Sequence, residues 1–127
     1  MGRFGVVAAI FGTLGLGTLT LATPVAAQTV DGGAYFSQHC QMCHTITAGQ
    51  PHGVGPNLAG VVGRKAASTD FYYSDALKAS GLAWTKANLD KFLTAPGQMV
   101  PGTRMMVSIP DPKQRAALVD FLAKQKP

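Results

Sequence analysis

The stretch Cys40-Gln41-Met42-Cys43-His44 constrains this chain more than any other. Its pattern, C-x-x-C-H, is typical of the covalent attachment of a c-type haem. Two thiols one helical turn apart can each form a thioether with one porphyrin, and the histidine that follows then lies under the iron. We therefore expect one haem c, bound through Cys40 and Cys43, with His44 as an axial ligand of the iron.

Two other interpretations of the motif stay open at this point. A C-x-x-C pair can be a thioredoxin-like redox disulfide, which needs a βαβ context. A zinc site needs two further ligands at a fixed spacing. The chain has no other cysteine, and His39 and His52 make no zinc pattern with the two thiols. The haem interpretation is therefore preferred.

Length and charge limit the fold and the partners. The chain has 127 residues, which predicts one small domain near the low end of what buries a self-sufficient core. Because both cysteines lie in the motif, no disulfide is left to stabilise it, and a large apolar cofactor would supply the missing core. The formal charge of +5 comes from scattered residues, so nucleic acid is not expected as a partner.

The N-terminus predicts a secretory signal peptide over residues 1–27, cleaved after Ala27. Arg3 forms a short positive region, residues 4–22 are apolar, and Val25-Ala26-Ala27 ends the segment in small residues. Cleavage leaves residues 28–127 as a periplasmic domain, which fits haem attachment because that step occurs outside the bacterial cytoplasm. The alternative is an uncleaved anchor, since the apolar run is close to membrane-spanning length.

Periodicity and capping residues predict an all-α chain of three or four helices joined by two long loops. Residues 31–48 are expected to hold the first helix and the chain that leaves it. The other expected helices cover 74–80, 85–93 and 111 to the end, and Asp31, Thr85 and Asp111 are the expected N-caps. The loops, 49–63 and 98–109, are unusually long for a compact domain. They make sense if they line the two faces of a flat cofactor. In the first loop, the Pro56 carbonyl is expected to accept the ring N–H of His44.

A haem electron carrier needs a second axial ligand, commonly Met or His. The candidates are Met42, Met99, Met105, Met106, His39 and His52. Met42 and His39 are too close to the motif to reach the other haem face. The residues by themselves leave the remaining four open.

The run Pro101-Gly102-Thr103-Arg104-Met105 resembles the P-G-T-K/R-M ligand loop of class I cytochromes c, of the mitochondrial and bacterial c2 type. The resemblance covers essentially all of residues 28–127. It implies a small cytochrome c fold wrapped around one covalent haem, with Met105 as the second ligand and Met106 as its neighbour. Further matches are Gly32, Phe36, Leu118 and Phe121 in the packed terminal helices, and residues 55–58 and 63–65 in the loop below the haem.

The same resemblance assigns residues near the haem propionates and the haem crevice. In the family, the residues at the places of Arg64, Tyr73 and Trp84 neutralise or hydrogen-bond the propionates, and Thr103 matches a position near the crevice. Simpler alternatives remain. Arg64 and Lys65 would then form a solvated surface pair, and Trp84 would be plain core.

Several positions depart from the family pattern. Phe92 stands where a tyrosine often hydrogen-bonds the methionine sulfur, and Leu77 stands where many members have a polar asparagine. Val107 replaces an aromatic residue that often guards the haem edge. Gly53, Gly97 and Gln98 occupy places where lysines are common. We therefore expect a drier pocket, a more apolar docking face and a weaker salt dependence of partner encounter.

The resemblance implies a monomeric, exported single-electron carrier and not an enzyme, since both axial positions are filled. Its expected partners are redox proteins: a cytochrome bc1-type donor, an oxidase, a reaction centre or a dehydrogenase. Two alternatives remain. One is a membrane-anchored or complex-bound cytochrome c subunit, and the other is a haem enzyme or ligand-binding protein whose methionine ligand is labile.

Overall fold

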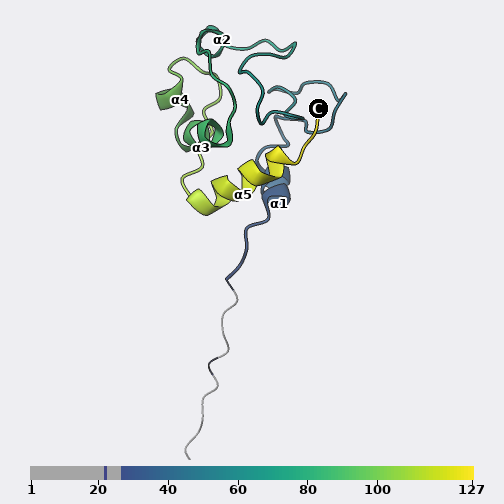
Figure 1. The fold of residues 1–127 in the computed structure, drawn as a ribbon, viewed down its shortest axis with the longest axis vertical. Helices are drawn as coiled ribbons and strands as arrows, with labels where there is room; N and C mark the ends of the chain where they lie inside the picture. The colour runs from purple at the N-terminus through teal and green to yellow at the C-terminus, as the bar shows by residue number, and fades with distance from the viewer. Residues whose placement is uncertain (1–21, 23–26) are drawn as a thin grey trace, which may run out of the picture.

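The structure is a computed structural model that describes residues 22 and 27–127. Five helices lie in this part of the chain (Figure 1): α1 (Gly32–His39), α2 (Asp75–Ala79), α3 (Lys86–Thr94), α4 (Pro96–Met99) and α5 (Pro112–Ala123). The described residues form no β-strand, and a single antiparallel bridge joins Lys65 to Ala83. The all-α prediction with long loops is confirmed.

Polar N-caps begin four of the five helices. In each case the side chain accepts a backbone N–H from the first helical turn, which satisfies a donor that the helix itself leaves free. In α1, for example, Asp31 Oδ1 accepts the N–H of Ala34 at 2.9 Å. The capping residues are Asp31, Ser74, Thr85 and Asp111. The starts expected from the sequence are confirmed.

Two helix boundaries add detail that the sequence did not predict. Helix α1 ends at His39, and the motif continues in turns, where the N–H of His44 donates to the Cys40 carbonyl at 2.9 Å. Pro96 was expected only to end the preceding helix. It also begins α4, because a proline suits the first turn of a helix, where its N–H is not needed. The helix count is therefore one above the expected range.

The two terminal helices cross in close contact (Figure 1), as expected. A Cβ atom at Gly32 would collide with the backbone carbonyl of Ala117 in α5, so only glycine permits this approach. Beside it, the rings of Phe36 and Phe121 lie 5.7 Å apart. This crossing fixes α1, whose C-terminal end leads into the motif, against the middle of α5.

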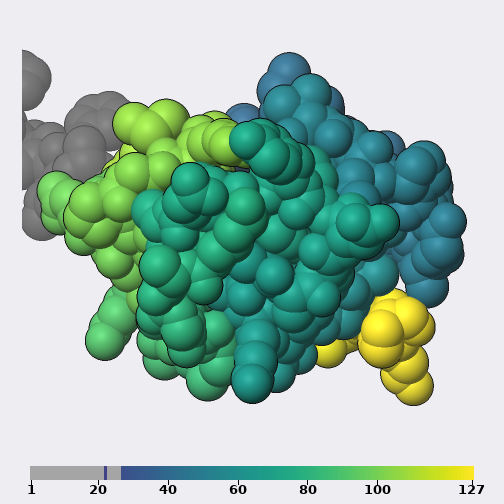
Figure 2. Space-filling view, turned by 90° about the horizontal axis from the view of Figure 1, so that it is seen from above, coloured from purple at the N-terminus to yellow at the C-terminus, as the bar shows by residue number. Residues whose placement is uncertain are grey.

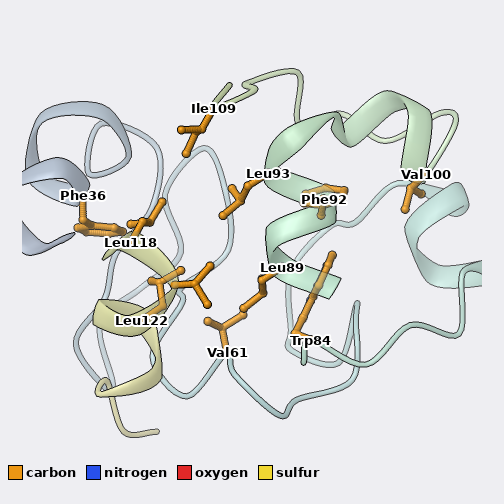
Figure 3. Packing of buried hydrophobic residues seen from close by; sticks show 11 residues of the cluster. Phe36, Val61, Trp84, Leu89, Phe92, Leu93, Val100, Ile109, Leu118 and Leu122 are labelled. Atoms are coloured by element: carbon orange, nitrogen blue, oxygen red, sulfur yellow. The ribbon is translucent and has the colours of Figure 1, made fainter. Parts of the chain in front are cut away.

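The buried core lies between α1, α3 and α5 (Figure 3). The labelled apolar residues of α3 and α5 point into it, and Leu118 and Ile109 are almost fully buried. The labelled members are Phe36, Val61, Trp84, Leu89, Phe92, Leu93, Val100, Ile109, Leu118 and Leu122. The helices thus provide a fixed frame against which the long loops pack.

The end of the molecule seen from above is covered mainly by the chain between α1 and α3, drawn blue to green (Figure 2). None of the helices in the described part of the chain is long and apolar enough to cross a membrane. The expected signal peptide lies outside the described residues, apart from Ala22 and Ala27.

Candidate haem-binding site

The two motif cysteines are part-buried, and both thiols are free. Cys40 packs against the hydrophobic core. Its burial, and secondly the proximity of Cys43, raise the pKa of the Cys40 thiol to about 11. A thioredoxin-like cysteine instead has a lowered pKa and lies in a βαβ unit. Because the described chain has no strand, the redox-disulfide interpretation does not fit the structure.

The ring of His44 is oriented by the loop that follows the motif. His44 Nδ1 lies 2.7 Å from the Pro56 carbonyl oxygen, which is the contact expected from the sequence. A carbonyl can only accept, so Nδ1 carries the proton and the Nε2 lone pair is free to bind a metal. Burial lowers the pKa of His44 and outweighs the opposing effect of the Pro56 bond. The net lowering of the pKa favours the neutral imidazole, and the Pro56 bond orients it.

Gly55 forms a cradle for the same ring. A Cβ atom there would lie 2.7 Å from Nδ1 and 2.9 Å from Nε2 of His44, closer than van der Waals contact allows. The Gly55 N–H also donates to the Cys43 carbonyl at 2.8 Å. The loop can therefore lie directly against the imidazole only because this residue has no side chain.

Asn57 organises this loop, a role that we did not predict. Its amide Nδ2 donates to the carbonyls of Thr47 and Gln50 at 2.8 and 2.9 Å, and its Oδ1 accepts the Ala59 N–H at 2.7 Å. The side chain is buried within an apolar loop, where each polar atom needs a partner. An asparagine directly after Gly-Pro was the available signal.

His52, a possible second ligand from the sequence, is engaged elsewhere. Its Nδ1 accepts the Asn57 N–H at 2.8 Å, and its ring packs edge-on against Phe71 with the centroids 5.4 Å apart. The structure thus places His52 in the packing of the first loop.

Backbone pairing brings together Arg64 and Trp84, which are 20 residues apart in the sequence. The Trp84 N–H donates to the Arg64 carbonyl, and the Gly63 N–H donates to the Trp84 carbonyl, both at 2.8 Å. Trp84 is buried and packs on Phe92, with the ring centroids 5.0 Å apart. The solvated pair of Arg64 and Lys65 does not form, since Arg64 is part-buried and bonded while Lys65 is exposed.

One nitrogen of the Arg64 guanidinium has no hydrogen-bond partner. Its terminal nitrogens donate to the Ala59 and Asn57 carbonyls at 3.0 and 3.1 Å. Its Nε is buried and has no hydrogen-bond partner. Buried donors normally have an acceptor. A haem propionate is a carboxylate, so it would supply the acceptor that the chain lacks here.

Two further residues from the resemblance are buried as well. The Tyr73 hydroxyl pairs with the Thr69 hydroxyl, and its ring packs edge-on against Phe71. Thr103 is buried in the second loop, where its N–H donates to the Val100 carbonyl at 3.0 Å.

The second loop directs Met105 inward and its neighbour outward. Met105 is part-buried and packs against the core, whereas Met106 is 76% exposed. Gly102 makes the preceding turn with a φ of +92°, a conformation that favours glycine. Of the remaining ligand candidates, Met99 also packs against the core, on α4. The placement agrees with the resemblance in favouring Met105 over Met106.

Two of the residues that depart from the family pattern are apolar and lie in or against the core. Phe92 is buried without a hydroxyl, and Leu77 packs against the core. Val107 is 54% exposed beside the ligand loop. A drier pocket is the expected consequence of the first two positions.

The donor set as a whole fits a covalently bound haem. It consists of two thiols, an imidazole with a free Nε2, an inward thioether and a guanidinium whose buried Nε lacks an acceptor. Among the described residues, those of the motif included, no group of three or more His, Cys, Asp or Glu side chains is placed to hold a metal ion. A structural zinc site usually needs four such ligands.

Comparisons with known proteins agree with this geometry. The family model described as "Cytochrome c" matches residues 29–126. The chain is 46% identical over 102 residues to a protein named cytochrome c2 from Rhodomicrobium vannielii, covering 79% of this chain and 81% of that protein. It is 41% identical to cytochrome c2 from Rhodoblastus acidophilus, covering 76% and 92%. Among solved structures, cytochrome cH from Methylobacterium extorquens is similar with a TM-score of 0.68 and 40% identity, covering 74% of this chain and 95% of that one.

Proposed function

Because the chain belongs to the cytochrome c family, we propose that it is an exported single-electron carrier that shuttles electrons between other redox proteins. One haem c, held through Cys40 and Cys43, is its cofactor. When bound, this group supplies an iron that alternates between Fe(III) and Fe(II).

The protein residues orient the ligands and exclude water. Pro56 and Gly55 hold the His44 ring so that Nε2 is available to the iron. Met105 is the proposed second ligand, and its soft thioether favours the reduced metal. The buried Phe92 and the part-buried Leu77 surround the site with apolar atoms, which also favours the less charged reduced state. A positive reduction potential follows.

The observation that carries the proposal is that the chain presents both an oriented His44 ring and a Met105 side chain that packs inward on the core. With His44 and Met105 as its ligands, the iron of a bound haem would have no open position for a substrate. The proposed role is therefore a carrier and not an enzyme, with Arg64, Tyr73, Trp84 and Thr103 supporting the haem.

Location and partners are also part of the proposal. Two bacterial relatives are named cytochrome c2, and the sequence begins with a predicted signal peptide, so we place the mature residues 28–127 in the periplasm. The proposed partners are redox proteins of the bc1, oxidase, reaction-centre or dehydrogenase type, and the carrier is proposed to be a monomer. The mass of protein isolated from the periplasm tests cleavage after Ala27.

A redox titration combined with carbon monoxide tests the function. The purified holoprotein is expected to titrate with one electron at a positive potential. Its reduced form is expected not to bind carbon monoxide at neutral pH, because Met105 fills the position that the gas needs. Rapid carbon monoxide binding would contradict the carrier role and favour a ligand-binding or enzymatic one.

A further inference from the structure

Tyr72 presents a large aromatic ring beside the loop that carries Met105, and two cations lie against this ring. The tyrosine is 76% exposed. The guanidinium carbon of Arg104 is 4.4 Å from the ring centroid, and Nζ of Lys78 is 5.4 Å from it. Both distances fall within the range of roughly 6 Å for cation–π attraction. An exposed tyrosine by itself is ordinary. This ring, however, joins its own segment to α2 through Lys78 and to the Met105 loop through Arg104.

Arg104 is held to Tyr72 in a second way. Its Nη1 donates to the main-chain carbonyl of Tyr72 at 2.7 Å. A guanidinium is planar and carries several donors, so it can stack on a ring while it hydrogen-bonds a neighbouring carbonyl. The two contacts together fix the side chain that immediately precedes Met105.

The chain around Tyr72 is held in place by its packed neighbours. On one side of it, Tyr73 is buried and pairs with Thr69. On the other side, Phe71 packs edge-on against both Tyr73 and His52. Because both neighbours of Tyr72 are packed, its backbone is held in place.

The Arg104 side has few other connections. Within the described chain, the bond from Arg104 is the one hydrogen bond that joins residues 104–108 to another segment. The next residues after Met105 are largely exposed, at 76% for Met106 and 54% for Val107. Loop segments with little burial and few hydrogen bonds open at low free-energy cost. The contact with Tyr72 therefore bears directly on how long Met105 stays in place.

We propose that Tyr72 and Arg104 form a latch that holds the Met105 loop closed. Tyr72 is a positioning residue in this scheme, since it acts on Met105 through Arg104. Lys78 contributes less, because it is farther from the ring and lies 3.3 Å from the carboxylate of Asp75. The latch rests on the proposed ligation by Met105.

Replacement of the methionine sulfur by imidazole measures the latch directly. The oxidised holoprotein is mixed with saturating imidazole, and loss of the weak far-red absorption band of the Fe(III)–sulfur bond is timed. Tyr72→Leu removes the ring and keeps the carbonyl, so exchange is expected to be about two- to fivefold faster. Tyr72→Phe keeps the ring and is expected to stay within about twofold of wild type. Arg104→Gln removes the cation over the ring and shortens the donor that reaches the Tyr72 carbonyl, so exchange is expected to be about tenfold faster.

Two controls separate a latch from a general effect. Lys113→Gln removes an exposed cation on α5 and should leave the exchange rate unchanged. The double variant Tyr72→Leu/Arg104→Gln should be no faster than Arg104→Gln, because the ring acts through the guanidinium. Both latch residues are exposed, so the variants should unfold at the wild-type midpoint.

A wild-type exchange rate in Tyr72→Leu would overturn the latch, as would equal acceleration in Lys113→Gln. Either result, obtained in a protein with a normal far-red band, leaves the proposed carrier function intact. A wild-type protein that lacks the band would refute Met105 ligation and the latch together, so the two failures are distinguishable.

Discussion

Gly55 and Pro56 have no reactive side chain, yet together they determine the protonated nitrogen and the orientation of the His44 ring. Pro56 supplies a carbonyl that fixes the proton on Nδ1, and Gly55 supplies the space in which the ring lies. The carbonyl bond was predictable from the sequence because the Gly-Pro pair follows the motif closely. The cradle was not, since the approach of the Gly55 backbone to the ring appears only in the folded loop.

Gly55→Ala is expected to destabilise the holoprotein by about 1–3 kcal/mol, because the new methyl group overlaps the His44 ring and either the ring or the loop must shift. The free energy of denaturant unfolding measures this. Gly97→Ala is the matched control, since a Cβ atom there meets nothing within 4 Å and lies in helix α4. Equal stability of Gly55→Ala and wild type would show that the loop does not lie against the ring.

At the scale of secondary structure, Arg115 joins two helices to the end of the Met105 loop. Its Nε donates to Asp90 Oδ1 on α3 at 2.8 Å, and its Nη1 donates to the Ile109 and Pro110 carbonyls at 2.9 and 2.8 Å. The arginine side chain is only 11% exposed. The segment that follows the Tyr72–Arg104 contact is therefore also fixed where it enters α5.

Arg115→Met keeps the length of the side chain and removes every donor, which leaves the buried Ile109 carbonyl without this partner. We expect a loss of about 2–3 kcal/mol in the free energy of unfolding. Lys86→Met is the matched control, because it breaks the exposed Lys86–Asp120 pair between the same two helices. That change should cost less than about 1 kcal/mol. Similar losses in both variants would contradict the role given to Arg115.

The elements that the sequence predicted well are those stabilised locally. Asp31 caps α1 through an N–H three residues away, and Thr85 does the same for α3, so the signal lies within one helical turn. The connections that were missed are made by distant partners. Arg115 bonds Asp90 across 25 residues, and Arg104 bonds Tyr72 across 32. Such contacts depend on the packed fold and leave no pattern in a single sequence.

The same contrast holds for the site. The motif predicted the first of the two proposed axial ligands through its short spacing, and the resemblance of the P-G-T-R-M run to a family ligand loop predicted the second. The sequence did not predict the contacts by which other residues of this chain hold the loops around those ligands. Asn57 spans the first loop, and Arg64 pairs with Trp84 through the backbone, two arrangements that exist only after the loops have folded.

On the scale of the whole molecule, charge is distributed away from the segments that carry the ligands. Residues 40–63 contain no Asp, Glu, Lys or Arg, and residues 95–110 contain Arg104 alone. Exposed apolar side chains lie in these segments instead: Met42, Val54, Met106 and Val107. A surface of this kind offers little electrostatic steering toward a charged partner.

Lysines added beside the ligand loop should restore that steering. The rate at which hexacyanoferrate(III) oxidises the reduced protein is measured across ionic strength. Gly97→Lys/Gln98→Lys is expected to raise the low-salt rate about two- to tenfold and to steepen its fall with salt. Ala116→Lys/Ala123→Lys adds the same charge on exposed positions of α5 and should have a smaller effect. Equal effects of the two pairs would show that net charge, and not its position, controls the encounter.

The central claim is that His44 and Met105 together fill the axial positions of one haem. Its most direct test is the far-red absorption band of the oxidised protein in wild type, Met105→Ala and Met106→Ala. The account predicts that the band is present in wild type, absent in Met105→Ala and retained in Met106→Ala, because Met105 packs inward while Met106 is exposed. A band that survives in Met105→Ala, or that is missing from the wild-type protein at neutral pH, would contradict it.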